Sequence, residues 1–437
     1  MIRLDKNFFP ACAVLSVSLA LAGCGQPYPE SQNFNTGQAV PPQTLPPPPS
    51  TSTTPTPGVT GKAGGPVALL VPLTGDLAPV GQALENAAKL AFPPDSSTPL
   101  DIRDTQGTPA GAAAAAQAAI AAGDGLILGP LTSAEAHAVA PIATAANVNV
   151  LAFTNDSSVD APGVWALGIS PDEQVKRALS YAAATGRTQV AAILPDTDFG
   201  HALGAALQSA TSSLGEPAPS LTFYDPGFSS INDALKQMSD YADRGAVLDA
   251  QIKAAKEEDT AAGFQKAAEL SQQQPPPPSF NALFIGAIDG GELGEMANLL
   301  PYYDVSQPQV QFIGPAPWGP IAAQLGANGV FRGAIYAAAD PAAASEFDQK
   351  YSAAYGAAPP AIADVAFDAA AIARLLASQG GFTSNLLTAP DGFTGADGVL
   401  QLGADGSVQR GLAVFETTGS GPNIVSPAPA SLNAPTS

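Results

Sequence analysis

Two short apolar runs of the chain are each followed by hydroxyl-bearing residues. Ser133 comes shortly after the run 125–129, and Ser158 shortly after the run 148–153. Runs of this length predict buried strands, and ligands bind at the carboxyl ends of strands in parallel sheets. Ser133 also stands at the start of a predicted helix (134–146), where free backbone amides attract an anion. Both serines are therefore candidate ligand contacts, although each is equally compatible with simple helix capping.

Residues able to do nucleophilic or metal chemistry are few. The chain has two histidines, His137 and His201, and neither lies beside a candidate nucleophile. Its two cysteines are Cys12 and Cys24, and it has no Gly-Lys-Ser/Thr phosphate loop or dinucleotide-type glycine motif. Two lone histidines are more typical of surface residues or helix caps than of a base or a metal pair. The sequence therefore predicts no enzyme, no metal site and no cofactor.

The stretch Gly65–Phe92 predicts the elements that would position such a site. Val67–Val71 is an apolar run too short for a membrane span, and Pro72 ends it. Pro79 then stands where the first turn of a helix tolerates proline. Apolar residues recur at helical spacing along one face after it, namely Val80, Leu84, Ala87, Ala88 and Ala91. Strand, glycine-containing turn and amphipathic helix form half of a βαβ unit.

The same alternation continues along most of the chain. Further predicted strands are 100–104, 125–129, 148–153, 189–194, 220–224, 282–285 and 310–314. Successive strand-helix steps indicate parallel sheets with right-handed crossovers and helices on both faces.

The opening VALLVPLTGDLAPVGQALENAAKLA and the later GPLTSAEA are similar to segments of the leucine-binding protein family, the type I periplasmic binding proteins. The opening also resembles the lipoprotein activators of penicillin-binding proteins, which use the same fold. The resemblance covers roughly residues 66–416, apart from a helical insertion. It implies an α/β fold of two Rossmann-like lobes with parallel sheets, joined by three hinge crossings.

The resemblance also implies a ligand site. Ser133 holds the place of a serine whose hydroxyl, with main-chain amides, binds an amino acid's carboxylate. Asp156 and Ser158 fall at positions that supply a backbone carbonyl and a hydroxyl to the α-amino and α-carboxylate groups. Phe199 replaces a tyrosine that covers the ligand, and Asp289 is an expected polar contact from the second lobe.

The loop Gly314–Trp318 departs from the amino-acid binders. Ala316 stands where they carry a glutamate for the ligand ammonium, and a lost charge-assisted hydrogen bond costs about 1.5–3 kcal/mol. Trp318 resembles a loop tryptophan of the penicillin-binding-protein activators, and is expected either to contact the ligand as a lid or to be a core residue.

The expected domain organisation rests on these matches. Residues 66–168 and 339–392 are assigned to the first lobe, and 169–338 and 393–418 to the second, which carries a helical insertion at 233–278. Residues 419–437 are expected to be a disordered tail, and 24–65 a disordered tether rich in proline and threonine.

The first 23 residues are typical of a signal peptide. Arg3 and Lys6 precede an apolar stretch that ends in Leu21-Ala22-Gly23-Cys24, which resembles the lipobox of bacterial lipoproteins. The resemblance implies a lipid on the Cys24 thiol, and Gly25 after it, rather than aspartate, favours the outer membrane over the inner. Once the signal is removed, the one remaining thiol leaves no partner for a disulfide within the mature chain.

The sequence supports two hypotheses about function. The first is a lipid-anchored periplasmic protein that binds a small amino-acid-like ligand for an ABC permease. The second is an interaction protein that activates a cell-wall synthase. The net charge of −21, without basic clusters, disfavours nucleic acid as a partner and leaves membrane attachment to the lipid.

The anchoring hypothesis is testable at Cys24. Because this cysteine is the one thiol suited to acylation, Cys24→Ala should remain uncleaved or leave the detergent phase, whereas the wild-type chain partitions into detergent. Detergent partitioning and the mass of the mature N-terminus measure this, and Cys12→Ala is the control. Equal partitioning of Cys24→Ala and wild type would contradict the lipoprotein hypothesis.

Overall fold

The computed structural model describes residues 61–62, 64–93, 97–273 and 275–432. Cys24, the signal peptide and nearly all of the tether therefore lie outside the described residues. Among the helices within these ranges, none has the length and apolar character needed to cross a bilayer.

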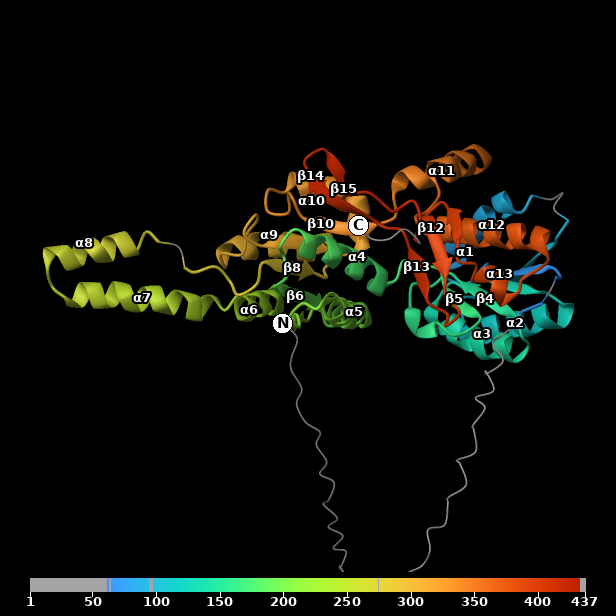
Figure 1. Cartoon of the computed structure of the whole chain (residues 1–437), viewed down its shortest axis with the longest axis horizontal. Helices are drawn as coiled ribbons and strands as arrows, with labels where there is room; N and C mark the ends of the chain where they lie inside the picture. The colour runs from blue at the N-terminus through green and yellow to red at the C-terminus, as the bar shows by residue number, and fades with distance from the viewer. Residues whose placement is uncertain (1–60, 63, 94–96, 274, 433–437) are drawn as a thin grey trace, which may run out of the picture. The chain divides into compact units, whose positions relative to one another are not determined.

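The first lobe is built on a five-stranded parallel sheet with the order β2-β1-β3-β4-β5 (Figure 1). Its strands are β1 (Val67–Val71), β2 (Leu100–Asp104), β3 (Leu126–Leu128), β4 (Asn149–Ala152) and β5 (Val164–Ala166). The helices between them are α1 (Ala78–Ala91), α2 (Pro109–Ala122) and α3 (Ser133–Ala145), with the short turn η1 (Ser157–Val159) after β4.

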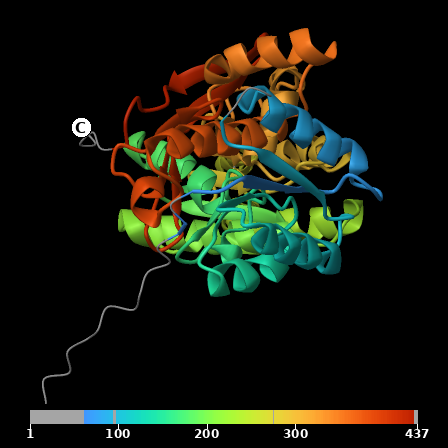
Figure 2. The ribbon, with the colours of Figure 1, turned by 90° about the vertical axis from the view of Figure 1, so that its right-hand side faces the viewer.

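Strand β1 is buried on both faces. Val67, Leu69 and Val71 pack into a core with α1 and with the late helix α12 (Ala363–Gln379). Ala68 and Leu70 point the other way, into a core formed with α2 and α3. Figure 2 shows the helices on either side of this sheet. The continuous apolar run of β1 thus reflects burial of both faces, as in other parallel sheets.

The second lobe contains a seven-stranded sheet with the order β15-β14-β10-β9-β8-β6-β7. Five strands are parallel: β6 (Val190–Pro195), β7 (Ser220–Tyr224), β8 (Ala282–Ile285), β9 (Gln311–Gly314) and β10 (Ile335–Ala338). One face is covered by α4 (Pro171–Ala184) and α5 (Asp198–Leu214). The other is covered by α6 (Phe228–Met238), α9 (Gly290–Tyr302), η2 (Ala316–Ile321) and α10 (Ala322–Ala327).

The last segments of the chain differ from the expected assignment. The antiparallel strands β11 (Phe393–Gly395), β12 (Gly398–Leu402) and β13 (Val408–Arg410) form a third sheet. Leu400 and Leu402 of this sheet pack into the core of the first lobe, together with β1 and α12, and not into the second lobe. The remaining helices α11 (Pro341–Tyr355) and α13 (Ser384–Leu387) contribute to the same core.

The expectation of a disordered tail from Gly419 is also wrong. Residues Gly421–Ser426 form β15, which pairs antiparallel with β14 (Ala413–Thr418) at the edge of the second sheet. Arg177 of α4 fixes this edge by donating to the carbonyl of Leu412 at 2.8 Å and to the Ser426 hydroxyl at 2.6 Å. The sequence pattern of β15 is weak because an edge strand is largely exposed to solvent.

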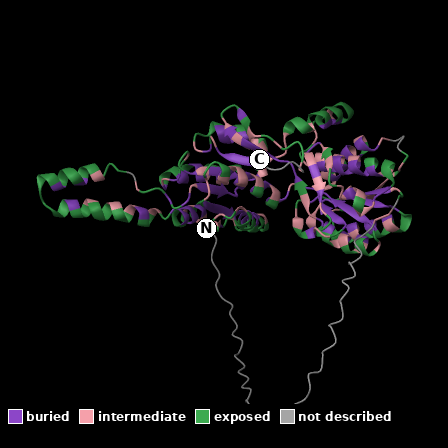
Figure 3. Cartoon of the chain, viewed as in Figure 1, coloured by how far each residue is buried: buried purple, intermediate pink, exposed green. Residues whose placement is uncertain are grey.

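The helical insertion is shorter than expected. Helix α6 belongs to the core of the second lobe, and the insertion proper is a hairpin of α7 (Tyr241–Glu257) and α8 (Ala261–Leu270). Figure 3 shows that most of the hairpin surface is exposed. Arg244 is one of its few buried residues, and its guanidinium donates to the carbonyls of Ser239, Pro276 and Tyr303, each at 2.7 Å.

The hairpin should therefore be dispensable for folding, whereas Arg244 should not. Replacing 248–270 with a short Gly/Ser linker should change the melting temperature by less than about 3 °C, because these residues contribute little to either core. Arg244→Ala should lower the free energy of unfolding by about 2–4 kcal/mol, because it leaves buried carbonyls without donors. Thermal and denaturant unfolding measure both variants. A large loss of stability in the linker variant would show that the hairpin is part of the core.

Candidate functional site

A cavity of about 800 Å³ lies at the carboxyl ends of the first-lobe strands and is lined by residues of both lobes. The segments after β3 and β4 contribute Ser133 and Asp156. The second lobe contributes Phe199 from α5 and Ala316 from the segment after β9. Helix α12 closes the wall with Asp364, and most of the remaining lining is apolar.

Ser133 and Asp156 are in direct contact. The Ser133 hydroxyl donates to Asp156 Oδ2, and the Ser158 amide donates to Asp156 Oδ1 at 2.9 Å. Partial burial opposes ionisation of Asp156, but the hydrogen bonds from Ser133 and Ser158 outweigh it and hold the pKa of this carboxyl below its ordinary value. Asp156 is thus an ionised acceptor at neutral pH.

His137 extends this group on the outer side. Its Nε2 lies 3.2 Å from Ser158 Oγ and 4.0 Å from Asp156 Oδ2. Because Ser133 and His137 are four residues apart on α3, they project from the same face of that helix. The contact with His137 orients the Ser158 hydroxyl. The three residues do not form a catalytic triad, because His137 meets both Ser158 and Asp156 through the same ring nitrogen, Nε2.

The start of α3 is fixed by a capping box. Thr132 caps the helix, and Glu135, which is fully buried, accepts from the Thr132 amide at 3.0 Å. Ser133 is the first residue of the helix, so its own amide has no acceptor within the helix. An amide and a hydroxyl of the same residue therefore stand together at the cavity wall.

Four of the six residues predicted to bind ligand are brought together. Ser133, Asp156 and Phe199 line the cavity of about 800 Å³, and the same three line an adjoining cavity of about 630 Å³. Ser158 lines the adjoining cavity but not the larger one. All four follow the carboxyl ends of strands, which is where the order of strand, loop and helix in the sequence leads one to expect a ligand site.

Asp289 and Trp318 line neither of these two cavities, so the structure does not bring them together with the other four residues. Asp289 is the cap of α9 and accepts from the amides of Gly291 at 2.8 Å and Glu292 at 3.2 Å. Trp318 is fully buried in the second-lobe core, and its indole Nε1 donates to the carbonyl of Ala287 at 2.9 Å. Gly314, which has no side chain, lets the indole lie directly against the strand, which explains why Trp318 is a core residue and no lid.

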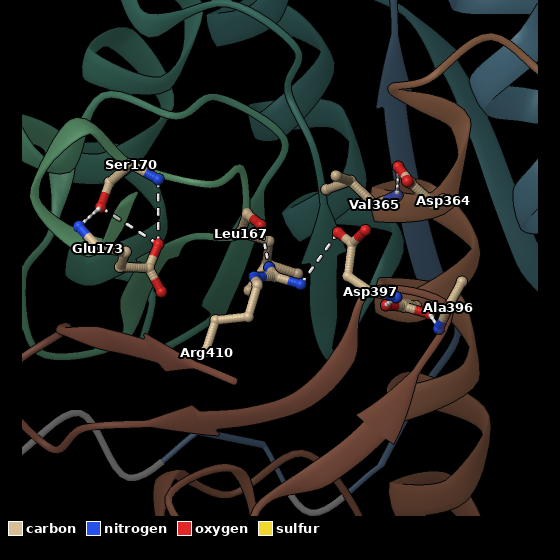
Figure 4. A network of polar contacts seen from close by, with 9 residues as sticks. Leu167, Ser170, Glu173, Asp364, Val365, Ala396, Asp397 and Arg410 are labelled. Carbon is tan, nitrogen blue, oxygen red and sulfur yellow. Dashed lines mark hydrogen bonds and ion pairs between the residues drawn. The ribbon is translucent and has the colours of Figure 1, made fainter. Parts of the chain in front are cut away.

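A buried polar network at the cavity wall was not predicted (Figure 4). Asp397 and Asp364 both line the cavity of about 800 Å³. Asp397 Oδ2 accepts from Arg410 Nη1 at 3.0 Å, and the other end of this guanidinium donates to the carbonyl of Leu167. Asp368, one turn after Asp364 on α12, accepts from the amides of Ala396 at 2.6 Å and Asp397 at 3.1 Å.

Carboxyl groups outnumber cations in this network. Burial, together with the neighbouring Asp397, raises the pKa of Asp364 to about 9. Burial and Asp397 also raise the pKa of Asp368 to about 6, against the hydrogen bonds from the two amides. Burial raises the pKa of Glu173 as well, although Arg410 opposes it. Asp364 and Asp368 are four residues apart at the alanine-rich start of α12, and this spacing was the signal in the sequence that two carboxyls would lie on one face of the helix.

The described residues contain no group of three or more His, Cys, Asp or Glu side chains arranged to hold a metal ion.

Comparison with known proteins defines the family. A periplasmic binding protein family model matches residues 66–421, so the chain belongs to this family. A search of curated proteins gives no match. The two-lobed arrangement of parallel sheets is that of the type I periplasmic binding proteins.

Three solved structures illustrate the likeness, each at low identity. A putative branched-chain amino acid ABC transporter protein from Rhodospirillum rubrum is 17% identical, with a TM-score of 0.63, over 83% of this chain and 100% of the other. The leucine binding protein LivK from Thermotoga maritima is 18% identical, with a TM-score of 0.51, over 83% of this chain and 98% of the other.

The third is LpoA from Haemophilus influenzae. Full-length LpoA is 16% identical, with a TM-score of 0.59, over 84% of this chain, and the match spans only 59% of LpoA. Its C-domain, described as a regulator of PBP1A, is 18% identical, with a TM-score of 0.58, over 83% of this chain and 100% of the domain. The structural neighbours thus include both transport proteins and a regulator.

The partly buried carboxyl of Asp364 predicts a specific dependence of stability on pH. Its folded pKa lies above the ordinary value of 3.8, so between about pH 4 and pH 9 the folded state binds a proton that the unfolded state has lost. Stability must therefore fall as the pH rises through this window. Asp364→Asn should remove this loss and stabilise the protein by about 2 kcal/mol at pH 8, with little effect at pH 4.

Denaturant unfolding at both pH values measures the effect. Asp348→Asn is the matched control, since Asp348 is exposed on α11. If both variants respond to pH in the same way, the carboxyl of Asp364 is ionised in the folded protein.

Proposed function

We propose that this chain is a lipid-anchored extracytoplasmic binding protein that takes a small amino-acid-like ligand for ABC-type transport. The observation that carries the proposal is the cavity of about 800 Å³, which receives carboxyl and hydroxyl groups from one side and, apart from the Gln174 amide, apolar cover from the second lobe. Cavities of this size and composition are typical of small-molecule sites.

The polar groups suit the two charged ends of an amino acid. Ser133 offers an amide and a hydroxyl to a carboxylate, and the N-terminal end of α3 adds a favourable dipole. Asp156, ionised and adjacent, offers a partner to an ammonium group. Binding would require the Ser133 hydroxyl to exchange its bond with Asp156 for one with the ligand.

The apolar cover comes from the second lobe. Phe199 and Pro317 line the cavity beside Ala316, and none of the three carries a charge. A ligand held in this way would be recognised by charge on the first-lobe side and by shape on the other side. The lipid on Cys24 would keep the protein beside its permease.

A second candidate function is regulation of a cell-wall synthase. It is supported by the exposed hairpin α7–α8, which neither lines the two cavities nor contributes substantially to the cores. LpoA, whose C-domain is described as a regulator of PBP1A, shares the fold. In this case the hairpin would carry the contact with the partner.

Thermal unfolding of the purified full chain with a panel of amino acids and short peptides tests the first function. A ligand that binds only the folded state at about 100 times its Kd should raise the free energy of unfolding by about 2.7 kcal/mol. The double variant Ser133→Ala/Ser158→Ala should keep its fold and lose the shift, because both hydroxyls at the two cavities are removed.

Ser345→Ala is the control, since Ser345 is exposed on α11 and bonds only within its helix. A panel without any shift of the wild type contradicts the amino-acid proposal. In that case, co-purification with a penicillin-binding protein that is lost when 248–270 are replaced would support regulation of the synthase.

A further inference from the structure

We propose that the ligand carries a second cationic group on its side chain, and that Asp364 and Asp397 receive it at the hinge wall of the cavity. The preferred ligand class is thus a basic amino acid or a related diamine. This inference rests on the proposed binding function and specifies its ligand.

The titratable residues that line the two cavities are all aspartates. They are Asp156, Asp364 and Asp397 in the larger cavity, and Asp156, Asp172 and Asp198 in the adjoining one. No lysine, arginine or histidine of the described residues lines either cavity. A cleft lined by one sign of charge concentrates ligands of the opposite sign, and the chain's net charge of −21 reinforces the effect.

Asp364 and Asp397 form the part of this lining best suited to hold a cation. Asp397 is 4% exposed, and its carboxylate is a neighbour that helps to raise the pKa of Asp364. Two carboxyls that oppose each other's ionisation are stabilised by a retained proton or by a nearby cation. The Asp364 side chain accepts from the neighbouring amide of Val365, at 2.8 Å, and it lines the cavity together with Asp397.

The protein's own cation does not neutralise the pair. Arg410 reaches Asp397 with one nitrogen and the Leu167 carbonyl with another, and it does not line the cavity. Glu173 also faces Arg410, and its Oε1 is buried without a hydrogen-bond partner among the described atoms. Three carboxyls, namely Asp368, Asp397 and Glu173, thus interact with one guanidinium, and no such interaction with Arg410 contributes to the pKa of Asp364.

The two polar regions belong to different walls of one cavity. Ser133 and Asp156 come from the strand ends, whereas Asp364 and Asp397 come from α12 and the β11–β12 turn. Apolar side chains, including those of Leu77 and Val80, contribute to the lining that both regions share. This arrangement fits an aliphatic chain that carries an amino-acid head at one end and a cation at the other.

Binding of the cation must be linked to a proton. The groups that face Asp364 are Asp397 from the β11–β12 turn and Asp368 from its own helix, with Arg410 of β13 and Glu173 of α4 behind Asp397. Because Asp364 holds a proton at neutral pH in the free protein, an ammonium that replaces this proton releases it to solvent. Affinity for a cationic ligand should therefore rise with pH, whereas affinity for a neutral one should not.

Lysine and norleucine are the matched probes, because norleucine has lysine's aliphatic chain without the terminal ammonium. Titration calorimetry with the full chain should show lysine binding at least about tenfold tighter than norleucine. Repeating the lysine titration at pH 7 in buffers of different ionisation enthalpy should show release of about one proton.

Asp364→Asn should reduce the preference for lysine to within about threefold and abolish the proton release, because it removes the titrating carboxyl while keeping the shape. Asp348→Asn, on the exposed face of α11, should keep both.

Three outcomes separate the inference from the function on which it rests. Norleucine or leucine binding as tightly as lysine overturns the inference and leaves the binding function standing. An unchanged lysine preference in Asp364→Asn also overturns it, because the ligand ammonium would then not depend on the Asp364 carboxyl. Absence of binding by every amino acid in the panel overturns both.

Discussion

The buried ion pair between Arg410 and Asp397 determines how the hinge region of this protein is organised. Arg410 belongs to β13, Asp397 to the turn between β11 and β12, and the Leu167 carbonyl to the segment that leads from the first lobe to the second. One guanidinium thus ties three segments that are far apart in the sequence. A buried pair of this kind contributes little net stability, but removing one partner leaves a charge in the interior and costs about 3–5 kcal/mol. The pair therefore constrains geometry more than it adds stability.

The position of Arg410 also determines the polarity of the cavity wall. Because Arg410 is held behind Asp397, the carboxyls of Asp364 and Asp397 are left facing the cavity with no cation of the protein's own between them. The same residues that fix the crossing segments thus give the cavity wall its polarity. One network thus has both a structural and a proposed binding role. In the absence of a ligand, burial and the neighbouring Asp397 make ionisation of Asp364 unfavourable, so this carboxyl keeps its proton.

Features that depend on local periodicity and on strand ends could be predicted from the sequence. The buried run of β1, the alternation of strands and helices, and the placement of Ser133 and Asp156 after strands all depend on residues close together in the chain. Trp318 and the network around Arg410 depend on contacts between distant segments. Trp318 is separated by about thirty residues from the carbonyl that its indole meets, and Arg410 by more than two hundred from Leu167. Periodicity carries no information on such pairs, which is why the polar network at the hinge was missed and the strands β11 to β13 were assigned to the wrong lobe.

The lack of a carboxylate at Ala316 can be explained by the carboxyls elsewhere in the cavity wall. Amino-acid binders of this fold are expected to place the partner of the ligand ammonium on the second lobe, whereas here Asp156 and Asp364 belong to the first lobe and Asp397 lies in the small sheet packed on its core. In the larger cavity, a ligand would then be held electrostatically on the first-lobe side before the second lobe contacts it. The second lobe offers Phe199, Ala316 and Pro317, and burial of their apolar surface, at about 25 cal/mol per Å², would supply the driving force for closure. Charge would therefore select the ligand in the first step, and apolar contact would retain it in the second, so that substitutions in the two walls should affect different steps of binding.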